Sequence, residues 1–414
     1  MINLSYFLLA LSLVVNQIFF VVISIFGLSY TGSEDSSLFS SVVLAINSLS
    51  IFIVIFKEAT LKYKSIVSKL YYLIPVIILF LFILEGCSIG EQSGKVLRSF
   101  LGFSVAPLYV AIFVLRSKTL PLLLKQFDLI MVICTIALVL NIPSMVTEYG
   151  FTRIGGGGGH QQISYTAAFC FGINLCGIIS HNSYDRYSIF RTKFFLWISY
   201  LLLALQVIIT IIGGGKGGLV LLLVNVFFIL IFVKRKSIKT IFQYALIIIP
   251  FLIIISSTLN NSFFDTFREG GIDRTLSIYS KGGIAAGDER FNIYDRVFQV
   301  VNDSPVIGHG LFRAYDELLG KTGIIYSHNL FLDALLQFGY IGFVFFFIFY
   351  IKAYSHIIWI AKNARKDMLL LPICLYPMTD LLFSNMYLTS SLFWFTLLTI
   401  VLHFRYMKSI ILLR

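Results

Sequence analysis

The sequence is poor in charge. Only 13% of its 414 residues are charged, whereas 58% are hydrophobic. Soluble globular domains carry about 25% charged residues, so this composition excludes an ordinary soluble protein. It predicts an integral membrane protein instead.

Signatures of several familiar kinds of site are also missing. The five cysteines include no pair with metal-binding or redox spacing, and we interpret them as packing residues. The sequence has no Asp-x-Asp pair to hold a nucleotide sugar through a divalent metal, no Walker-type glycine loop and no ATP-binding domain. We therefore expect no cofactor and no metal site.

What the chain does contain is a series of long apolar runs. A helix that crosses a bilayer needs roughly 20 apolar residues, and about 12 such runs are present. They predict an all-α fold, a polytopic inner-membrane helical bundle. The predicted spans are residues 4–28, 37–56, 70–86, 97–115, 127–147, 162–180, 194–212, 217–233, 240–258, 328–351, 369–386 and 389–406.

The net charge of +12 is interpreted as a topology signal and not as a sign of nucleic-acid binding. If the N-terminus lies inside, 21 of the 32 basic residues fall in six short inside segments. The short outside loops then carry only Lys95, Arg98, Arg153 and Lys216. Because short inside loops are enriched in Lys and Arg, we expect both termini in the cytoplasm.

Soluble-type sequence accumulates in one large loop, residues 259–327, which we expect on the periplasmic side. The predicted parts of the chain are helices 1–9 (residues 1–258), this loop, and helices 10–12 (residues 328–414). Within the loop, residues 288–302 predict an amphipathic helix that lies across the outer mouth of the bundle. Its apolar residues at helical spacing are Phe291, Tyr294, Val297, Phe298 and Val301.

The loop ends at the most informative motif of the chain. Ser327-His328-Asn329 begins an apolar helix, and Gly339-Tyr340-Ile341-Gly342 follows. The pattern His-Asn-x9-Gly-x-x-Gly resembles the signature of the bacterial O-antigen ligase and polymerase superfamily. The preceding stretch DERFNIYDRVFQVVNDSPVIGHG is similar to the arginine-containing helix and Pro-x-x-Gly-x-Gly turn of that family. The resemblance covers mainly residues 285–350.

Two earlier stretches, RIGGGGGHQQIS and GGGKGG, stand where the family places basic residues that face the periplasm. The family often has arginine near the second of these, whereas this chain has Lys216. The resemblance therefore implies a phosphate-binding role for Arg153 and, with that substitution, for Lys216.

The resemblance also implies an activity and a set of partners. Members of the superfamily transfer a glycan from undecaprenyl diphosphate to an acceptor hydroxyl, without a metal, at the periplasmic face of the Gram-negative inner membrane. Ligases use lipid A-core as acceptor, and polymerases use a second undecaprenyl-diphosphate-linked repeat unit. The implied partners are the lipid-linked oligosaccharide donor and acceptor and membrane lipids, with a chain-length regulator as a candidate and no nucleic acid.

The need for cationic residues at such a site follows from the chemistry of the reaction alone. A departing lipid diphosphate gains negative charge, and fixed cations beside it stabilise the transition state. Arginine suits this role because its planar fork pairs with phosphate oxygens. Arg290, Arg153 and Lys216 are the outside cations best placed by sequence, and Arg296 is a weaker candidate. The alternatives are a surface ion pair for Arg290 and a membrane-interface anchor for Arg153.

His328 is the candidate that handles the acceptor hydroxyl, because neutral imidazole accepts a proton near neutral pH. The alternative is a histidine that only caps a helix. Asn329 either caps the helix or orients His328. His160 is a further candidate for contact with sugar hydroxyls, against an ordinary loop role.

Other residues carry weaker expectations. Asp380 lies inside a predicted span, where a carboxylate is costly and faces a cavity or a partner, so we assign it to substrate binding or support of a site. Gly339 and Gly342 stand on one helical face and predict the close approach of a neighbouring helix or a lipid chain. His309, in a glycine-bracketed turn, is interpreted as structural.

These patterns predict an O-antigen type polysaccharide polymerase with His328 and Arg290 as catalytic residues. The nearest alternative is an O-antigen ligase, which shares the site. A flippase or transporter of lipid-linked oligosaccharide is the remote alternative. Such a protein should carry several charges along a path through the membrane, whereas the only charge well inside a predicted span here is Asp380. The predicted substrate-binding residues are Arg153, Lys216, Arg296, His160, Asn329 and Asp380.

The predicted topology can be checked by labelling. Cysteines introduced as Lys281→Cys and Lys362→Cys should react with a membrane-impermeant reagent from opposite faces, because one position lies in the large outer loop and the other in a short inside loop. Labelling of both from one side would contradict the helix count and, with it, the position of the site.

Overall fold

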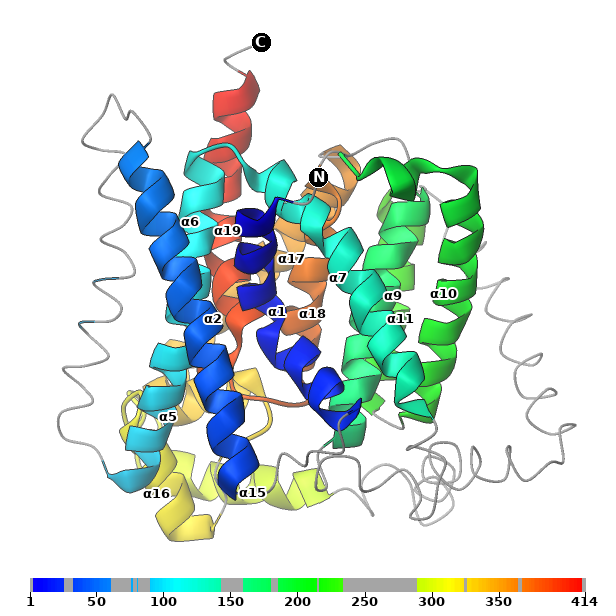
Figure 1. Ribbon diagram of the computed structural model, residues 1–414. Coiled ribbons are helices and arrows are strands. Elements are labelled where there is room, and N and C mark those ends of the chain that lie inside the picture. Colours follow the sequence, from blue (N-terminus) through cyan, green and yellow to red (C-terminus); the bar gives the residue numbers. More distant parts are fainter. Residues whose placement is uncertain are drawn as a thin grey trace, which may run out of the picture.

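Figure 1 shows the computed structural model of the protein, a bundle of helices. It describes residues 3–25, 33–60, 76, 80, 90–142, 159–179, 185–213, 216–233, 289–323, 326–363 and 367–411. Every regular element among these residues is helical. The predicted all-α class is therefore confirmed.

The helices of the bundle overlap the predicted spans, but some differ in their bounds: the helix Leu120–Leu140 begins and ends seven residues before the predicted 127–147, and the helix Leu370–Asp380 fills only the first part of the predicted 369–386. They are α1 (Leu4–Ile25), α2 (Ser33–Thr60), α5 (Glu91–Phe103), α6 (Val105–Arg116), α7 (Leu120–Leu140), α9 (Gly159–Ile179), α10 (Lys193–Ile212), α11 (Lys216–Phe228), which continues as the π-helix η3 (Ile229–Val233), α17 (Leu330–Asn363), α18 (Leu370–Asp380) and α19 (Ser391–Ile411). Two short helices, α15 (Glu289–Val301) and α16 (Arg313–Thr322), precede α17.

Six stretches within the described residues are long and apolar enough to cross a membrane. They are Ser40–Thr60, Glu91–Arg116, Leu120–Leu140, Gln162–Ile179, Lys193–Ile211 and Leu330–Asn363. Shorter apolar stretches lie in α1, α11 and α19. The chain is a polytopic membrane protein. The predicted spans 70–86 and 240–258 lie outside the described residues, apart from residues 76 and 80.

The bundle has two distinct ends. α15 and α16 lie together at one end, whereas α1 begins and α19 ends at the opposite end (Figure 1). The predicted amphipathic helix at 288–302 is confirmed as α15, which lies across its end of the bundle (Figure 1). Val297 and Val301 are buried as the pattern predicted, but Phe298 is 44% exposed.

The centre of the bundle is α18. All eleven of its residues are buried, and it packs against α9, α11, α17 and α19. A helix that is apolar on every side is stable only where other helices cover it completely. α18 therefore forms the core around which the other helices are arranged.

A buried ion pair fixes α7 and α9 to the segment before α10. The Arg186 guanidinium donates through Nε and Nη2 to the Asp128 carboxylate at 2.9 and 2.8 Å, and through Nη1 to the Gly177 carbonyl at 3.0 Å. The side chains of Arg186 and Asp128 are 1% and 0% exposed. Loss of either partner would leave an uncompensated buried charge, which costs about 3–5 kcal/mol.

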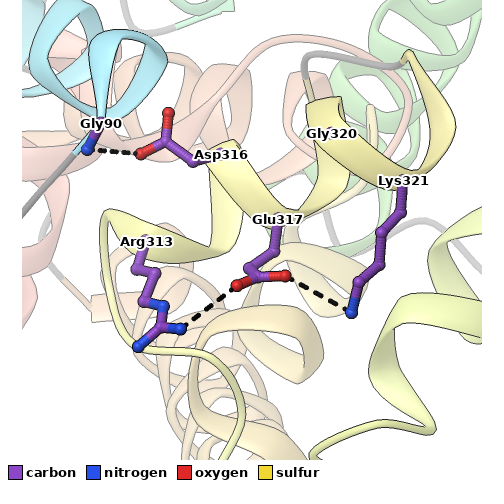
Figure 2. A pocket seen from close by; sticks show the side chains of 6 residues that line it. All are labelled: Gly90, Arg313, Asp316, Glu317, Gly320 and Lys321. Atoms are coloured by element: carbon purple, nitrogen blue, oxygen red, sulfur yellow. Dashed lines mark hydrogen bonds and ion pairs between the residues drawn. The ribbon is translucent and has the colours of Figure 1, made fainter.

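α16 is fastened to the first turn of α5 by one carboxylate. Asp316 accepts hydrogen bonds from the backbone N–H groups of Gly90, Gln92 and Ser93 at 2.9, 3.0 and 3.2 Å. Figure 2 shows the bond from Gly90. The Ser93 hydroxyl also contacts the Asp316 carboxylate and the Phe312 carbonyl. The first turn of a helix has N–H groups without intrahelical partners, so Asp316 caps α5 from another part of the chain.

The contribution of the Asp316 cap to the free energy of unfolding should be measurable. Burial alone would raise the pKa of Asp316, but the hydrogen bonds from Ser93, Gly90 and Gln92 hold it below its ordinary value. Asp316→Ala should cost about 1–2 kcal/mol of unfolding free energy at neutral pH, the usual effect of a lost cap. Because the folded-state pKa is lowered, the difference from wild type should shrink once the pH falls towards the ordinary Asp value of about 3.9, and it should vanish only as the pH falls through the lower folded-state pKa.

Thermal unfolding of the purified protein in detergent measures this difference. Asp303→Ala is the matched control, because Asp303 is an exposed acid in the same region that forms a surface ion pair with Lys321. The control should change stability by less than about 1 kcal/mol. Equal stability of Asp316→Ala and wild type at neutral pH would rule out the capping role.

Candidate active site at the start of α17

His328 occupies a strained turn between α16 and α17. Its φ is +58°, in the left-handed region that few residues other than glycine adopt. The side chain is half-buried, and its ring centroid lies 4.1 Å from that of Tyr326. A backbone held in this region costs of order 1–3 kcal/mol and persists only where its surroundings enforce it.

The turn is held from within by Ser327 and Asp333. The Ser327 hydroxyl donates to Asp333 Oδ1 at 2.6 Å and also lies 2.8 Å from the Asn329 carbonyl. The Asn329 N–H in turn donates to the Ser327 hydroxyl at 3.2 Å. Ser327 and Asp333 are fully buried. The two neighbours of His328 in the chain, Ser327 and Asn329, are therefore held in fixed positions.

Asn329 caps α17, as one of its two predicted roles required. Its Oδ1 accepts hydrogen bonds from the N–H groups of Phe331 and Leu332 at 2.9 and 3.2 Å. Its Nδ2 donates to the Leu382 carbonyl at 3.0 Å, and the next N–H, that of Leu330, donates to Leu381 at 2.8 Å. These bonds attach the His328 turn to the segment that follows α18.

Asp380 is the last residue of α18, directly before that segment, so the structure brings two predicted site residues, Asp380 and Asn329, to the same place. Asp380 is 2% exposed, and its Oδ2 accepts a hydrogen bond from Asn385 at 2.7 Å. Its Oδ1 is buried and has no hydrogen-bond partner among the described residues. Gln162 near the start of α9 approaches Asn385 at 3.5 Å. α9, the end of α18 and the start of α17 therefore converge here.

Lys216 and His160 stand in the first turns of α11 and α9, two helices that pack together. The contact is close because Gly217 has no side chain. A Cβ at Gly217 would lie 1.6 Å from the Tyr165 hydroxyl. The structure thus places the backbones of Lys216 and His160 at the starts of neighbouring helices, while their side chains, and the whole of Arg153, lie outside the described residues.

Arg290 stands in the first turn of α15, and its side chain also lies outside the described part. α15 packs against the beginning of α17 through Val297 and Val300, in a cluster that includes Leu335 and Leu336. Arg296 is exposed, and its guanidinium donates to the Thr322 carbonyl at the end of α16 at 3.2 Å. Arg296 therefore links the two short helices.

The glycine motif that begins at Gly339 and the Pro-x-x-Gly-x-Gly turn at residues 305–310 pack directly against each other. α17 breaks at Gly339, where φ is +62° and ψ is −160°. A break removes the helical bonds from the N–H groups of Tyr340 and Ile341 to the carbonyls of Leu336 and Gln337.

The turn at residues 305–310 satisfies all four of these groups. The N–H groups of His309 and Gly310 donate to Leu336 and Gln337 at 3.0 and 2.9 Å. The carbonyls of Pro305 and Val306 accept from Tyr340 and Ile341 at 2.8 and 3.3 Å.

This contact is possible only without side chains. A Cβ at Gly339 would lie 2.3 Å from the Val306 backbone, and one at Gly308 would lie 2.4 Å from the Gln337 backbone. The predicted close approach at Gly339 is therefore real, but its partner is the 305–310 turn and not a helix or a lipid. His309 is structural as predicted, with its Nε2 2.8 Å from the Val300 carbonyl.

A buried polar cluster that the sequence analysis missed completes the site's support. Gln337 of α17 donates to the Tyr315 hydroxyl of α16 at 2.8 Å and accepts from the Tyr387 hydroxyl. Tyr387 lies in the short helix η6 (Tyr387–Thr389). No spacing in the sequence signals this contact. Asp333 was also missed, although an acidic residue in the first turn of a helix is a recognisable signal.

Comparison with known protein families gives a match to part of the bundle and the segment before α17. No curated protein matches the chain. A family model described as O-antigen ligase (Wzy_C) matches residues 199–347, from α10 through the break in α17. The matched region contains Lys216, Arg290, Arg296, His328 and Asn329. The family acts on lipid-linked glycans at the membrane. The match confirms the resemblance found at the histidine motif: residues 199–347 are similar to the O-antigen ligase domain, which is consistent with the O-antigen ligase and polymerase superfamily.

Proposed function

We propose that the protein is an O-antigen type polysaccharide polymerase. It transfers a growing glycan from undecaprenyl diphosphate to the acceptor sugar of a second undecaprenyl-diphosphate-linked repeat unit. The observation that carries this proposal is the His328 turn, a half-buried imidazole in a left-handed backbone conformation held by neighbours on both sides. Strain of this kind clusters at functional sites.

In the proposed reaction, His328 accepts the proton of the acceptor hydroxyl as its oxygen attacks the anomeric carbon of the donor glycan. A new glycosidic bond forms, and the bond between the anomeric carbon and the diphosphate oxygen breaks. The proton passes from the imidazole to water, and undecaprenyl diphosphate leaves with the electron pair. Proton transfer by a positioned imidazole contributes about 10²–10⁴-fold in rate.

The departing diphosphate requires positive charge. Arg290 and Arg153, with Lys216, are proposed to hold it, and Arg296 is the weaker candidate. Positions 290 and 297 are two helical turns apart and share one face of α15, and Val297 packs against the start of α17. His160 would contact sugar hydroxyls, while Asn329 and Asp380 support the site. These residues supply the charge themselves, so the proposed transfer is metal-independent.

The proposed orientation follows from charge and from the ends of the bundle. The end that carries α15 and α16 faces the periplasm of a Gram-negative inner membrane, and both termini face the cytoplasm. Supporting this, Arg116, Lys125 and Lys362 belong to the short basic segments predicted to be inside. The donor and acceptor lipids then reach His328 from the outer leaflet, where a chain-length regulator would also bind.

The second candidate is an O-antigen ligase that uses lipid A-core as acceptor. The description of the matching family supports it directly. Donor binding and the role of His328 would be the same, and only the acceptor would differ.

The site can be tested by substitution. His328→Ala should lower glycan transfer at least about 10²-fold. His328→Asn should be equally inactive, and asparagine tolerates the left-handed backbone, so this variant separates lost chemistry from lost folding. Transfer from purified lipid-linked donor is measured at equal protein levels. Near-normal transfer by His328→Asn would reduce the histidine to a structural turn residue.

The same assay tests the cation. Arg290→Ala should lower transfer by about 10²–10³-fold, the usual loss of one transition-state donor. Arg290→Lys should recover little, because charge remains but the planar fork is lost. Arg313→Ala is the matched control, since Arg313 is an exposed arginine of α16 that pairs with Glu317 at 3.4 Å. An equal loss of glycan transfer in Arg290→Ala and Arg313→Ala would contradict a specific role of Arg290.

Deletion of the gene separates polymerase from ligase. Loss of a polymerase leaves a single repeat unit on lipid A-core, because the cell's ligase still works. Loss of a ligase leaves bare core and long chains on undecaprenyl diphosphate. Gel analysis of lipopolysaccharide should show core plus one repeat, restored to a ladder by the intact gene and not by His328→Asn. Bare core with accumulated lipid-linked polymer would establish the ligase instead.

A further inference from the structure

A cavity with both polar and apolar walls lies between α2 and α5, apart from the His328 turn. Its volume is about 360 Å³. The residues that line it are Ser40, Val43 and Leu44 of α2 and Lys95, Arg98, Ser99, Gly102 and Phe103 of α5. Two cations and two hydroxyls thus stand beside three apolar side chains. From the sequence alone, Lys95 and Arg98 are interpretable only as topology signals.

The charge balance of this cavity is positive. Lys95 pairs with Glu91 at 2.7 Å, an exposed contact one turn away. Arg98 makes no hydrogen bond or ion pair with any residue that the structure describes, and it is exposed. Lys95 and Arg98 are three residues apart and so lie on the same side of α5. One guanidinium fork therefore remains available, with an ammonium group beside it, for an anion.

The apolar part of the cavity continues along α2. Leu44, Phe52 and Ile55 are 56%, 63% and 61% exposed. The stretch Ser40–Thr60 is also the least buried of the six membrane-crossing stretches. A ligand that fits both parts has an anionic head and a long hydrocarbon chain.

Helix α5, which lines the cavity, is linked to the His328 turn by hydrogen bonds through the segment that follows α18. α5 begins at the Asp316 cap, at the end of the bundle that carries α15 and α16 (Figures 1 and 2). At the other end of α5, the Phe103 carbonyl accepts a hydrogen bond from Ser391 at 2.7 Å, and Ser104 donates to Leu388 at 2.5 Å. η6 follows the segment that binds Asn329. One connected segment, 381–391, thus touches both α5 and the His328 turn.

We infer that this cavity binds the phosphate head of a second lipid substrate, the acceptor. Arg98 and Lys95 hold the phosphate oxygens, and the hydrocarbon chain lies along α2. This inference rests on the proposed polymerase function, which requires two polyprenyl diphosphate substrates at once. A resident anionic phospholipid offers the same phosphate chemistry, so the test must distinguish the two sources.

Native mass spectrometry of the full-length protein counts bound lipid directly. The probe is undecaprenyl diphosphate, added to protein that has been freed of lipid in detergent. Wild type should retain two molecules, one at each site. The double variant Lys95→Gln/Arg98→Gln should retain one, with binding of the second weakened at least about ten-fold. Arg313→Gln, which removes an exposed arginine at the same end of the protein, should retain two.

The competing lipid is phosphatidylglycerol at equal concentration. If the cavity serves the acceptor, phosphatidylglycerol should leave the second undecaprenyl diphosphate in place. Its displacement would assign the cavity to a structural phospholipid and overturn the inference. Two bound molecules in a folded, monodisperse double variant would overturn it as well.

The outcomes for wild type separate this inference from the proposed function. Retention of a single undecaprenyl diphosphate by wild type would end the second-site inference and leave the donor site, and with it transfer at His328, standing. Retention of none would contradict the proposed function itself, because no lipid diphosphate substrate would bind.

Discussion

The structure depends on how a broken membrane helix satisfies its backbone. In hydrocarbon, each unpaired N–H or carbonyl group costs several kcal/mol. The break at Gly339 exposes four such groups, and the turn at residues 305–310 pairs with every one of them. The turn therefore cannot move away from α17 without leaving these groups unpaired. The first half of α17, with His328 before it, is held in place by this requirement.

The segment before α17 is consequently part of the bundle and not a loose connection. α16 is attached to α17 and η6 through the Tyr315–Gln337–Tyr387 cluster. It is attached to α5 through Asp316. Buried polar networks of this kind specify one arrangement, because each member is costly to leave unpaired. The rigidity of the His328 turn thus comes from contacts with several helices at once.

Rigidity of this kind suits a reaction in which charge moves. Catalysis needs groups that already stand where the proton and the negative charge will arise, so that nothing has to reorganise during the reaction. Ser327 and Asn329 fix the turn that holds His328. The nearby carboxylates of Asp333 and Asp380 are both buried. Two of the cations proposed for the diphosphate, Lys216 and Arg290, stand in the first turns of α11 and α15, which are separate elements.

Part of the site was accessible from the sequence. The His-Asn-x9-Gly-x-x-Gly spacing located the turn, and Asn329 caps a helix because asparagine does so by its own chemistry. The glycines indicated a close backbone approach. Their partner could not be predicted, because a glycine reports only that something comes near, and Gly308 lies about thirty residues away in the chain. The contact between Asn329 and Leu382 is equally invisible, since a backbone carbonyl leaves no mark on the sequence.

The sequence by itself determined that the chain is an all-helical membrane protein, the approximate positions of the helices that the structure describes, and where an amphipathic helix precedes the histidine motif. Hydrophobic length and periodicity are local properties, so they can be read from neighbouring residues. Only the tertiary structure decided which helix breaks, what repairs the break, and that Asp380, Gln162 and the His328 turn meet. Those facts depend on pairings between residues far apart in the chain, which form only when the whole bundle packs around α18.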